Sequence, residues 1–385
     1  MEKINNPRTE IDRIDTELLR LLNERARVAL RVGAAKSDRD DALCDPTREH
    51  AVLARVRTEN PGPFDEHGIE NIFQRIIDES LYLQQKHFNK PAIEEPAASQ
   101  GIGVVAVGSR VAFLGARGTF SEEAASAILN DGCQLVSFPT FESLFRAIEE
   151  EKADYILTPL ENSLVGSVHR CYDLLLRSSL SIVAELVLPV SHFLVAPENA
   201  TLETIRTVES HPAALAQCER FFAAYPHLRA VAAGDTAGSV QRAVESGDDT
   251  RAAIGSKRAA AIYGGKILRE HLEDHAENFT RFALLSNEKT DADTADKISL
   301  VVRLKHKPGA LHSALRPFVR RGLDLLKIES RPIKDSPKEF NFYIDLRPPV
   351  NDGELAGALK EIDEHTEDVR FLGRYSTINL KSDQN

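Results

Sequence analysis

An apolar stripe with helical spacing runs through the beginning of this chain. Over residues 7–36, apolar residues recur at steps of three, four and seven, the repeat of one face of an α-helix. The stripe consists of Ile11, Ile14, Leu18, Leu21, Val28 and Val32. Helical patterns follow at about 46–57 and 65–87, separated by a Pro- and Gly-containing breaker at 60–63. Because no strand pattern precedes residue 90, this part of the chain is predicted to be all-helical.

Two cations break the pattern of the first predicted helix. Arg25 lies within the apolar stripe, and Lys36, eleven residues later, lies only about 20° away around a helix. A buried cation without an anionic partner is unfavourable by several kcal/mol. One interpretation is a salt bridge to Asp45 or Glu49. The other is a bound anionic small molecule.

Further polar residues favour the bound ligand. Arg8 and Arg48 lie at helix starts, and Ser80 and Gln84 lie one turn apart on the third predicted helix. This set suits a small dicarboxylate with an ether oxygen. Arg8 and Arg25 are 17 residues apart, which is about 25 Å along a helix and too far for both to bind one small ligand. A second chain must therefore supply Arg8 if it takes part, which predicts a dimer.

After a weakly patterned linker that ends near residue 110, short apolar runs alternate with helical patterns. The runs lie at 111–114, 155–157, 182–184 and 192–195. This alternation predicts α/β architecture. The stretch 186–195 leads into a second set of βα units, and 279–285 can return the chain to the first set. Two lobes, joined by two crossings and separated by a cleft, are predicted.

Polar clusters follow several predicted strands of this region, where open α/β sheets bind ligands. Thr119 and Ser121 lie where a glycine-containing loop enters a helix; Ser121 is expected to start that helix, and its exposed amides would favour an anion. The other clusters contain Glu161, Asn162, Ser163, Ser210, Gln217, Thr280 and Arg281. Each cluster alone is also compatible with a cap or a turn. Side chains alternate along a strand, so Thr280 is predicted to face the cleft or the core, and Arg281 the opposite way.

The C-terminal part has the order strand, helix, strand, strand, helix, strand. These elements are expected at 297–304, 309–321, 324–333, 340–346, 353–365 and 369–375. This order is typical of the ferredoxin-like α+β unit.

Length and composition exclude several classes of protein. The 385 residues suggest two or three domains, and 42% hydrophobic with 28% charged residues excludes wholesale disorder. The net charge of −11, without any run of consecutive lysines and arginines, argues against nucleic acid as a partner. The chain shows no secretory leader pattern and no uncharged apolar run of about 18 residues, so a cytoplasmic protein that does not bind membranes is expected.

No metal site is expected from the cysteines and histidines. His271 and His275 have a spacing that can bind zinc, but a third ligand is missing from the pattern. The cysteines match neither a metal motif nor a dense disulfide framework and are predicted to be reduced, mostly buried thiols. They are Cys44, Cys133, Cys171 and Cys218.

The N-terminal polar set resembles the pocket of the all-helical chorismate mutases, which are intertwined three-helix dimers. The resemblance rests on Arg8, Arg25, Lys36, Asp45, Arg48, Glu49, Ser80 and Gln84. It implies that the three arginines hold the two carboxylates of chorismate, with Arg8 supplied by the partner subunit. It also implies that Lys36 and Gln84 hydrogen-bond the breaking ether oxygen, while the remaining three residues orient the ring hydroxyl or neighbouring groups.

Residues 111–285 are similar to the prephenate dehydratases, with a two-lobed fold like that of periplasmic binding proteins. The most specific motif is Thr280-Arg281-Phe282. The resemblance implies that Thr280 donates a proton to the departing ring hydroxyl and that Arg281 counters a carboxylate. It further implies substrate contacts from Thr119, Ser121, Asn162, Ser163, Ser210 and Gln217, with Glu161 supporting the same site. The resemblance also implies that the product is phenylpyruvate and that no cofactor is required.

Residues 297–376 resemble an ACT regulatory domain. Two motifs look like phenylalanine-binding motifs: Gly309-Ala310-Leu311-His312, in which His312 replaces a commonly apolar residue, and Glu329-Ser330-Arg331. The first motif is also compatible with an ordinary helix entry and the second with a solvated strand edge.

These resemblances imply a multidomain chain with a mutase domain at 1–90, a linker at 91–110, a dehydratase domain at 111–285 and an ACT domain at 297–376. The expected function is a bifunctional enzyme of phenylalanine biosynthesis that converts chorismate to prephenate and prephenate to phenylpyruvate. Inhibition by phenylalanine and at least a homodimer are expected. Two alternatives are a dehydratase with a helical dimerisation arm and a non-catalytic amino-acid sensor.

Overall fold

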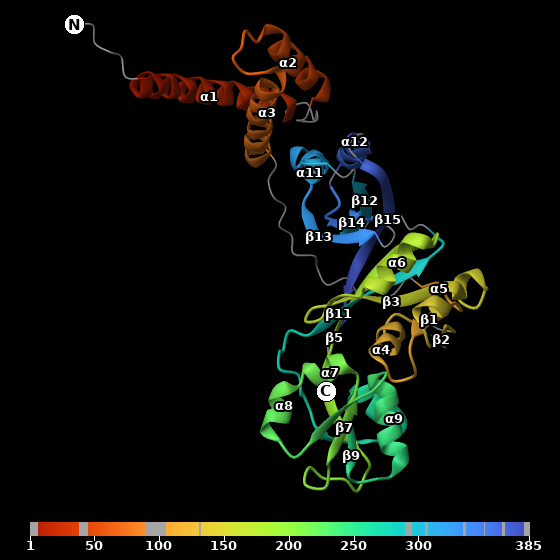
Figure 1. Cartoon of the computed structure of the whole chain (residues 1–385). Coiled ribbons are helices and arrows are strands. Elements are labelled where there is room, and N and C mark those ends of the chain that lie inside the picture. Colours follow the sequence, from red (N-terminus) through yellow and green to blue (C-terminus); the bar gives the residue numbers. More distant parts are fainter. Residues whose placement is uncertain are drawn as a thin grey trace. The chain divides into compact units, whose positions relative to one another are not determined.

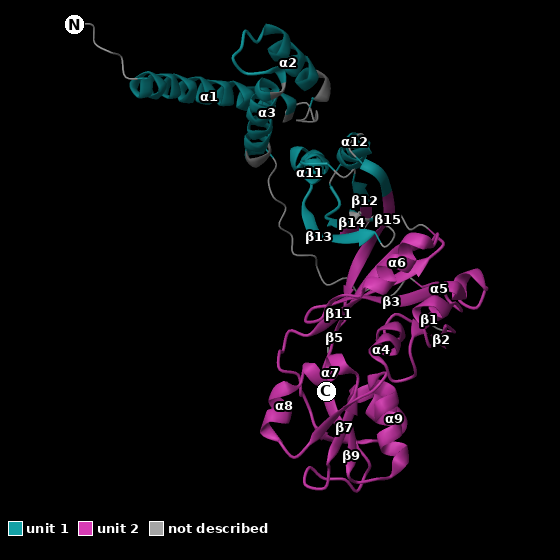
Figure 2. Cartoon of the chain, in the orientation of Figure 1, with its two compact units in different colours: residues 1–95, 302–369 teal, residues 96–301, 370–385 magenta. Residues whose placement is uncertain are grey.

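The computed structural model describes residues 7–37, 45–88, 105–130, 132–288, 295–304, 307–333, 336–349, 351–363 and 366–380. The chain divides into two compact units (Figure 2). Unit 1 contains residues 1–95 and 302–369, and unit 2 contains residues 96–301 and 370–385. Two strands, β12 (Lys297–Leu304) and β15 (Thr366–Asn379), run across the unit boundaries.

The N-terminal part of unit 1 consists of three helices, as predicted (Figure 1). They are α1 (Pro7–Ser37), α2 (Pro46–Glu59) and α3 (Glu66–Phe88). The α2 helix starts at Pro46 because the Asp45 carboxylate accepts the Arg48 N–H at 3.0 Å as an N-cap. A small core forms where Leu53 of α2 meets Ile77 and Leu81 of α3.

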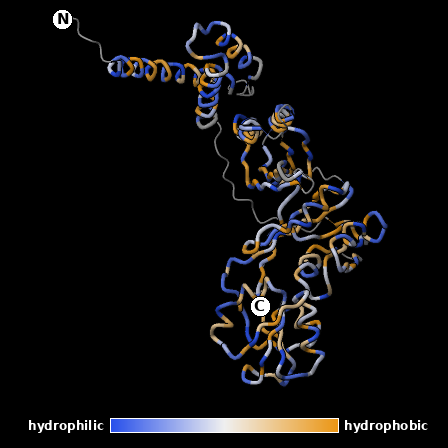
Figure 3. Tube along the Cα trace, viewed as in Figure 1, coloured by the Kyte–Doolittle hydropathy of each residue, from blue (hydrophilic) through white to orange (hydrophobic). Residues whose placement is uncertain are grey.

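The apolar stripe of α1 is largely solvent-accessible. Its six side chains, from Ile11 to Val32, are between 43% and 56% exposed. Apolar residues recur along the full length of α1 in Figure 3. A helix of 31 residues with an uncovered stripe is typical of a helix that packs against another chain.

The remainder of unit 1 contains α11 (Ala310–Arg320), β13 (Leu325–Ile333), β14 (Ser336–Leu346) and α12 (Asp352–Asp363). With β12 and β15 the chain order is β12-α11-β13-β14-α12-β15, which confirms the predicted element order. The strands lie in the spatial order β13-β14-β12-β15, and α11 contacts α12.

The first lobe of unit 2 is a mixed sheet with the strand order β15-β5-β11-β3-β1-β2. Its strands are β1 (Arg110–Leu114), β2 (Gln134–Phe138), β3 (Tyr155–Asn162), the short β4 (Gly166–Ser167), β5 (Ser181–Pro189) and β11 (Phe279–Ser286). Its helices are α4 (Phe120–Ser126), α5 (Phe141–Glu149) and α6 (His169–Arg177). The β11 strand lies between β3 and β5 and is antiparallel to both.

The second lobe is a five-stranded sheet with the order β10-β6-β9-β7-β8. Its strands are β6 (Phe193–Ala196), β7 (Thr207–Ser210), β8 (Arg229–Ala232), β9 (Arg251–Gly255) and β10 (Lys266–Arg269). Its helices are α7 (Pro212–Ala216), α8 (Glu219–Ala224), α9 (Thr236–Ser246) and α10 (Lys257–Tyr263). The chain enters this lobe between β5 and β6 and leaves it between β10 and β11, which confirms the predicted two crossings.

Three cysteines lie within the described residues, and all three are free thiols. Cys133 is partly buried, whereas Cys171 and Cys218 are fully buried; Cys44 lies outside the described residues. Burial raises the pKa of Cys171 and of Cys218 to about 12. Both side chains are therefore thiols, with very little thiolate, at neutral pH.

We expect iodoacetamide at pH 8 to leave Cys171 and Cys218 unmodified in the folded protein, because the thiolate is the nucleophile and both groups are buried and protonated. Peptide mass spectrometry after timed quenching measures this, with Cys133 as the accessible reference and the guanidinium-unfolded chain as the control for full reactivity. Modification of Cys171 as fast as of Cys133 contradicts the assignment.

Within the described residues, no helix has both the length and the apolar character needed to cross a membrane.

Candidate active sites

The first candidate site is a cavity of about 380 Å³ among the three N-terminal helices of unit 1. Seven of the eight residues predicted for this region line it: Arg25, Lys36, Asp45, Arg48, Glu49, Ser80 and Gln84. The apolar part of the wall comes from Val28, Ala29, Val32, Val52, Phe73, Ile77 and Leu81, and Arg55 adds a further cation. The eighth residue, Arg8, lies in the first turn of α1 and does not line this cavity.

Arg25 is one of the cations that line this cavity. Its Nη1 atom donates to Ser80 Oγ and, at 3.3 Å, to the Ile76 carbonyl oxygen. Within the described residues no carboxylate forms an ion pair with Arg25, so neither Asp45 nor Glu49 is its partner. Burial lowers the pKa of Arg25 below its ordinary value. The partly buried charge thus faces the cavity without a compensating carboxylate, which is the electrostatic situation that an anionic ligand relieves.

The other polar residues of this cavity have defined positions. Gln84 is buried and uses one N–H to donate to the Ala29 carbonyl oxygen at 2.5 Å, which fixes α3 against α1. Asp45 caps α2. Glu49, also buried, forms an ion pair with Arg320 of α11. The cavity therefore offers cations on α1 and α2 and hydrogen-bonding groups on α3.

The second candidate site is a cavity of about 730 Å³ between the two lobes of unit 2. Five of the predicted residues line it: Thr119, Ser121, Asn162, Gln217 and Thr280. Further lining side chains are Phe120, Glu142, Ser167, His192, His211, Asp235, Thr236 and Phe282. The two lobes both contribute, because β3 and β11 carry Asn162 and Thr280, whereas α7 leads into Gln217 at its C-cap.

A chain of hydrogen bonds connects Thr280 to His192 along the wall of this cavity. Thr280 Oγ1 accepts from Asn162 Nδ2 at 3.1 Å, and the same nitrogen donates to Asn278 Oδ1 at 2.9 Å. Gln217 Oε1 accepts from Asn278 Nδ2 at 3.1 Å and lies 2.7 Å from His192 Nε2. Because Asn162 donates to the Thr280 hydroxyl, that hydroxyl retains its own proton for a ligand.

His192 was not singled out by the sequence as a site residue. It is 2% exposed, and burial lowers its pKa. A neutral imidazole with its proton on Nε2 is the form that donates to Gln217 Oε1. The available sequence signal is a polar residue immediately before the apolar strand β6, at one of the crossings between the lobes.

Four of the residues expected at this site are not among the side chains that line this cavity: Glu161, Ser163, Ser210 and Arg281. Ser210 is fully buried and donates to the Ile254 carbonyl oxygen at 2.7 Å. Ser163 Oγ donates to the Glu277 carbonyl oxygen at 3.0 Å. Arg281 and Glu161 form an ion pair at 2.7 Å, on the side of β11 opposite Thr280. These side chains bind the protein itself, so they support the wall of the cavity.

The glycine-containing loop before α4 is held by a buried carboxylate. The helix begins at Phe120 with Thr119 as its N-cap, not at Ser121. Glu122, 3% exposed, accepts the Gly118 N–H at 2.6 Å and pairs with Arg258 at 3.1 Å. Burial opposes its charge, but Arg258 and the Gly118 N–H outweigh this and lower its pKa. The Gly118 N–H, which precedes this helix, is thus bound by Glu122.

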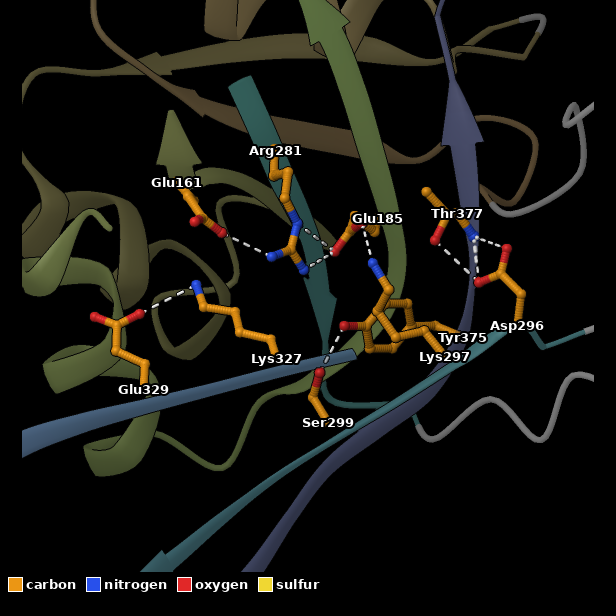
Figure 4. A network of polar contacts seen from close by, with 10 residues as sticks. All are labelled: Glu161, Glu185, Arg281, Asp296, Lys297, Ser299, Lys327, Glu329, Tyr375 and Thr377. Carbon is orange, nitrogen blue, oxygen red and sulfur yellow. Dashed lines mark hydrogen bonds and ion pairs between the residues drawn. The ribbon is translucent and has the colours of Figure 1, made fainter. Parts of the chain in front are cut away.

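The two motifs predicted to bind phenylalanine lie in unit 1. Gly309 has a φ of +79° and precedes α11, whose first residue, Ala310, is buried and whose second, Leu311, is 37% exposed. Glu329 forms an ion pair with Lys327 on β13 at 3.1 Å (Figure 4). Ser330 and Arg331 follow on the same strand and lie opposite Phe342 and Asn341 of β14.

Across the described residues, no group of three or more His, Cys, Asp or Glu side chains is arranged to hold a metal ion. His271 and His275 do not share a helix, and His271 Nδ1 lies 3.3 Å from Glu273 Oε1.

Comparison with known proteins matches both regions. Residues 7–85 match the family of type II chorismate mutases, and residues 111–290 match the prephenate dehydratase family. The chain is 35% identical to the bifunctional chorismate mutase/prephenate dehydratase of Neisseria gonorrhoeae, over 97% of each chain. It is 32% identical to that of Aquifex aeolicus, over 99% of this chain and 100% of the other. A solved prephenate dehydratase from Arthrobacter aurescens, in complex with L-Phe, is 30% identical with a TM-score of 0.65, over 70% of this chain and 90% of that one.

A helical cavity lined with cations and a two-lobed α/β cleft lined with hydroxyl and amide groups define an enzyme with two separate sites for small polar molecules. With near full-length relatives above 30% identity, this chain belongs to the bifunctional chorismate mutase/prephenate dehydratase family.

Proposed function

We propose that chorismate rearranges to prephenate in the helical cavity of unit 1 and that prephenate is dehydrated in the cleft of unit 2. The chain is bifunctional, with chorismate mutase and prephenate dehydratase activities. The observation that supports the division is that the two cavities share no residue and differ in charge. Three arginines and a lysine line the first, which suits a dicarboxylate, whereas hydroxyl and amide groups line the second. Neither reaction requires a cofactor.

In the proposed mutase reaction, Arg25 and Arg48 bind the carboxylates of chorismate. Lys36 and Gln84 hydrogen-bond the ether oxygen, on which negative charge develops as its bond to carbon breaks, and Asp45, Glu49 and Ser80 orient the ring hydroxyl and neighbouring groups. The rearrangement is pericyclic and forms no covalent intermediate with the enzyme. Its catalysis therefore comes from holding the compact conformer and from stabilising the developing charge.

We propose that the mutase part is a homodimer in which each site receives Arg8 from the partner subunit. Two observations support this. The part of the α1 stripe outside the cavity, from Ile11 to Leu21, is about half exposed, and a second copy of the same helix would cover it. Arg8 lies at the opposite end of α1 from Lys36, so it does not reach the cavity of its own chain.

In the proposed dehydratase reaction, Thr280 donates a proton to the departing ring hydroxyl of prephenate. The bond to the ring carboxylate breaks, carbon dioxide leaves, and its electron pair completes the aromatic ring as the hydroxyl leaves as water. The products are phenylpyruvate, carbon dioxide and water. Asn162 and Gln217 orient Thr280 and the substrate. Thr119 and Ser121 bind the substrate where α4 begins. Residues that do not line the cleft support these groups by contacts within the protein: Glu161, Ser163, Ser210 and Arg281.

We propose that residues 297–376 form an ACT domain of the ferredoxin-like class, which follows a mutase domain at 1–90, a linker at 91–110 and a dehydratase domain at 111–285. Phenylalanine binds this domain and inhibits the dehydratase. The βαββαβ order and the solved relative in complex with L-Phe support this assignment. The contacts are expected from Gly309, Ala310 and Leu311 on one element and from Glu329, Ser330 and Arg331 on the next.

We expect Gly309→Ala to weaken phenylalanine binding about fivefold or more, measured by calorimetric titration of the full-length chain. Gly309 has a φ of +79°, and a left-handed conformation disfavours a residue with a Cβ by about 1–2 kcal/mol. The first turn of α11 therefore shifts, although nothing within 4 Å clashes with the new methyl group.

Gly264→Ala is the matched control for this titration. Gly264 also has a positive φ, of +70°, also has nothing within 4 Å of a Cβ, and follows α10 in unit 2. The control is expected to bind phenylalanine as the wild type does. Equal affinity of the two variants argues against the Gly309 motif, and the absence of any binding to the wild type removes the regulatory proposal while leaving both activities in place.

A further inference from the structure

The face of β11 opposite the cleft carries a buried ion cluster (Figure 4). Thr280 lines the cleft, and the next residue, Arg281, points away from it with a side chain only 12% exposed. Arg281 contacts Glu161 of β3 and Glu185 of β5, the two strands on either side of β11. The cluster therefore spans the three central strands of the first lobe.

Glu185 is the most deeply buried member, with a side chain 1% exposed. Its Oε2 atom accepts from Arg281 at 3.1 Å (Nε) and 2.5 Å (Nη2), and its Oε1 atom accepts from Lys297 Nζ at 2.5 Å. Arg281 uses its remaining terminal nitrogen to reach Glu161 at 2.7 Å. In these three described ion pairs, two cations face two carboxylates. Because these side chains are largely buried from solvent, removal of one cation leaves an uncompensated buried charge.

The cluster is directly joined to the proposed catalytic groups. Arg281 follows Thr280 on β11, and Glu161 precedes Asn162 on β3. In the strand register Thr280 lies opposite Asn162, and Arg281 lies opposite Glu161. The 3.1 Å hydrogen bond between Asn162 and Thr280 on one face and the 2.7 Å ion pair on the other thus fix the same pair of backbone segments.

Lys297 comes from a separate part of the chain. It is the first residue of β12, beyond the 111–290 segment that matches the dehydratase family. Its neighbour Asp296 accepts the Thr377 N–H at 3.0 and 3.1 Å and the Thr377 hydroxyl at 2.9 Å. Thr377 lies opposite Glu185 in the pairing of β15 with β5. The Asp296 contacts therefore place the Lys297 ammonium on Glu185 (Figure 4).

We propose that Lys297 is a positioning residue for prephenate dehydration. By neutralising Glu185, it leaves Arg281 free to hold Glu161, and so keeps β11 and β3 in the register that orients Thr280 and Asn162. The inference rests on the proposed role of Thr280. Strand β12, the first strand of residues 297–376, thus contributes a charge on the side of β11 opposite the dehydratase cleft.

Lys297→Met keeps the length of the side chain and removes the charge. Glu185 then draws the Arg281 guanidinium toward itself, and the opposite contact with Glu161 weakens. A small displacement of a catalytic group is enough to reduce turnover strongly. We expect the kcat of dehydration to fall about tenfold or more, with KM within about twofold, because Lys297 does not line the cleft.

The test uses the full-length chain and added prephenate. Lys152→Met is the matched control, since Lys152 forms an ion pair with Glu150 at 2.7 Å but is 59% exposed. Thermal unfolding followed by circular dichroism reports whether each full-length variant is folded, because mutase turnover reports only on the helices of unit 1. Lys297→Arg retains the charge and is expected to recover most of the lost kcat, which a role in packing alone does not predict.

Glu185→Gln tests the pair from its other end if Lys297→Met fails to fold. It leaves the Lys297 ammonium beside Arg281 without their shared carboxylate, so it is expected to lower kcat with KM retained. The double variant Glu185→Gln with Lys297→Met, in which both charges are removed, should lose no more than the worse single variant. A kcat within twofold of wild type in a folded single variant, a loss confined to KM, or additive losses in the double variant each overturn the proposal. Thr280→Val tests the proposed function independently, because it leaves this cluster intact.

Discussion

Thr280→Val lowers the turnover of prephenate dehydration by at least about 100-fold, because loss of a positioned proton donor typically costs about 10²–10⁴ in rate. The substitution preserves the shape of the side chain and removes only the hydroxyl that lines the cleft and accepts from Asn162 at 3.1 Å. Formation of phenylpyruvate from added prephenate measures the effect. Mutase turnover of the same protein is expected to be unchanged, because the mutase cavity lies among the helices of unit 1.

Thr158→Val is the matched control for this substitution. Thr158 is also a sheet threonine, lies on the neighbouring strand β3 and is fully buried, but it does not line the cleft. Its hydroxyl contacts Cys171 Sγ at 3.4 Å. We expect this variant to dehydrate prephenate at a rate near that of wild type. If Thr280→Val behaves like the control, Thr280 is a packing residue and another group must supply the proton.

Local periodicity predicted most of the fold. The repeat of three and four positions predicted the C-terminal end of α1 to within one residue. This is possible because the apolar face of an amphipathic helix is formed by residues that are close in sequence. The alternation along β11 separated Thr280 from Arg281, since neighbouring side chains of a strand lie on opposite faces. The chain crossings between lobes were predictable for the same reason, as apolar runs with strand length stand out from helical patterns.

The side-chain contacts that the sequence did not predict join residues that are far apart in the chain. Ser210 ends β7 beside the cleft, but its hydroxyl donates to Ile254 of β9, and only the strand order determines that partner. Glu122, which holds the loop before α4 through the Gly118 N–H, is paired with Arg258, 136 residues away in sequence. Lys297 reaches Glu185 from 112 residues away. Periodicity carries no information about such partners, because they are set by the packing of distant segments.

Arg25 shows that a violation of local pattern can still point to a site. A cation in an apolar stripe left two interpretations, a salt bridge and a ligand. The structure pairs Glu49 with Arg320 and uses Asp45 as a helix cap, so neither carboxylate neutralises Arg25. Sequence alone did not decide this, because Arg320 lies on α11, far along the chain.

Arg25→Ala is expected to lower mutase turnover by at least about 100-fold, because a preorganised charge is lost from a site in which charge stabilisation drives the reaction. Dehydration of added prephenate by the same protein should stay near the wild-type rate. Arg27→Ala is the matched control, since Arg27 is on the same helix but exposed and outside the cavity. Mutase turnover within tenfold of wild type in the Arg25 variant refutes the assignment of this cavity.

Mixing two inactive variants tests whether Arg8 acts across the dimer. If each site uses Arg25 of one subunit and Arg8 of the other, Arg8→Ala and Arg25→Ala are both inactive as homodimers. A mixed dimer then has one site with both arginines and one site with neither. Random exchange of equal amounts makes half of the dimers mixed, so about one quarter of the wild-type mutase activity returns. Recovery requires an arginine supplied in trans, because Arg8 and Arg25 on one helix are too far apart to serve one small ligand. If exchange is shown by mass spectrometry of the mixed dimers and no activity returns, each site is built from a single chain and Arg8 is not part of it.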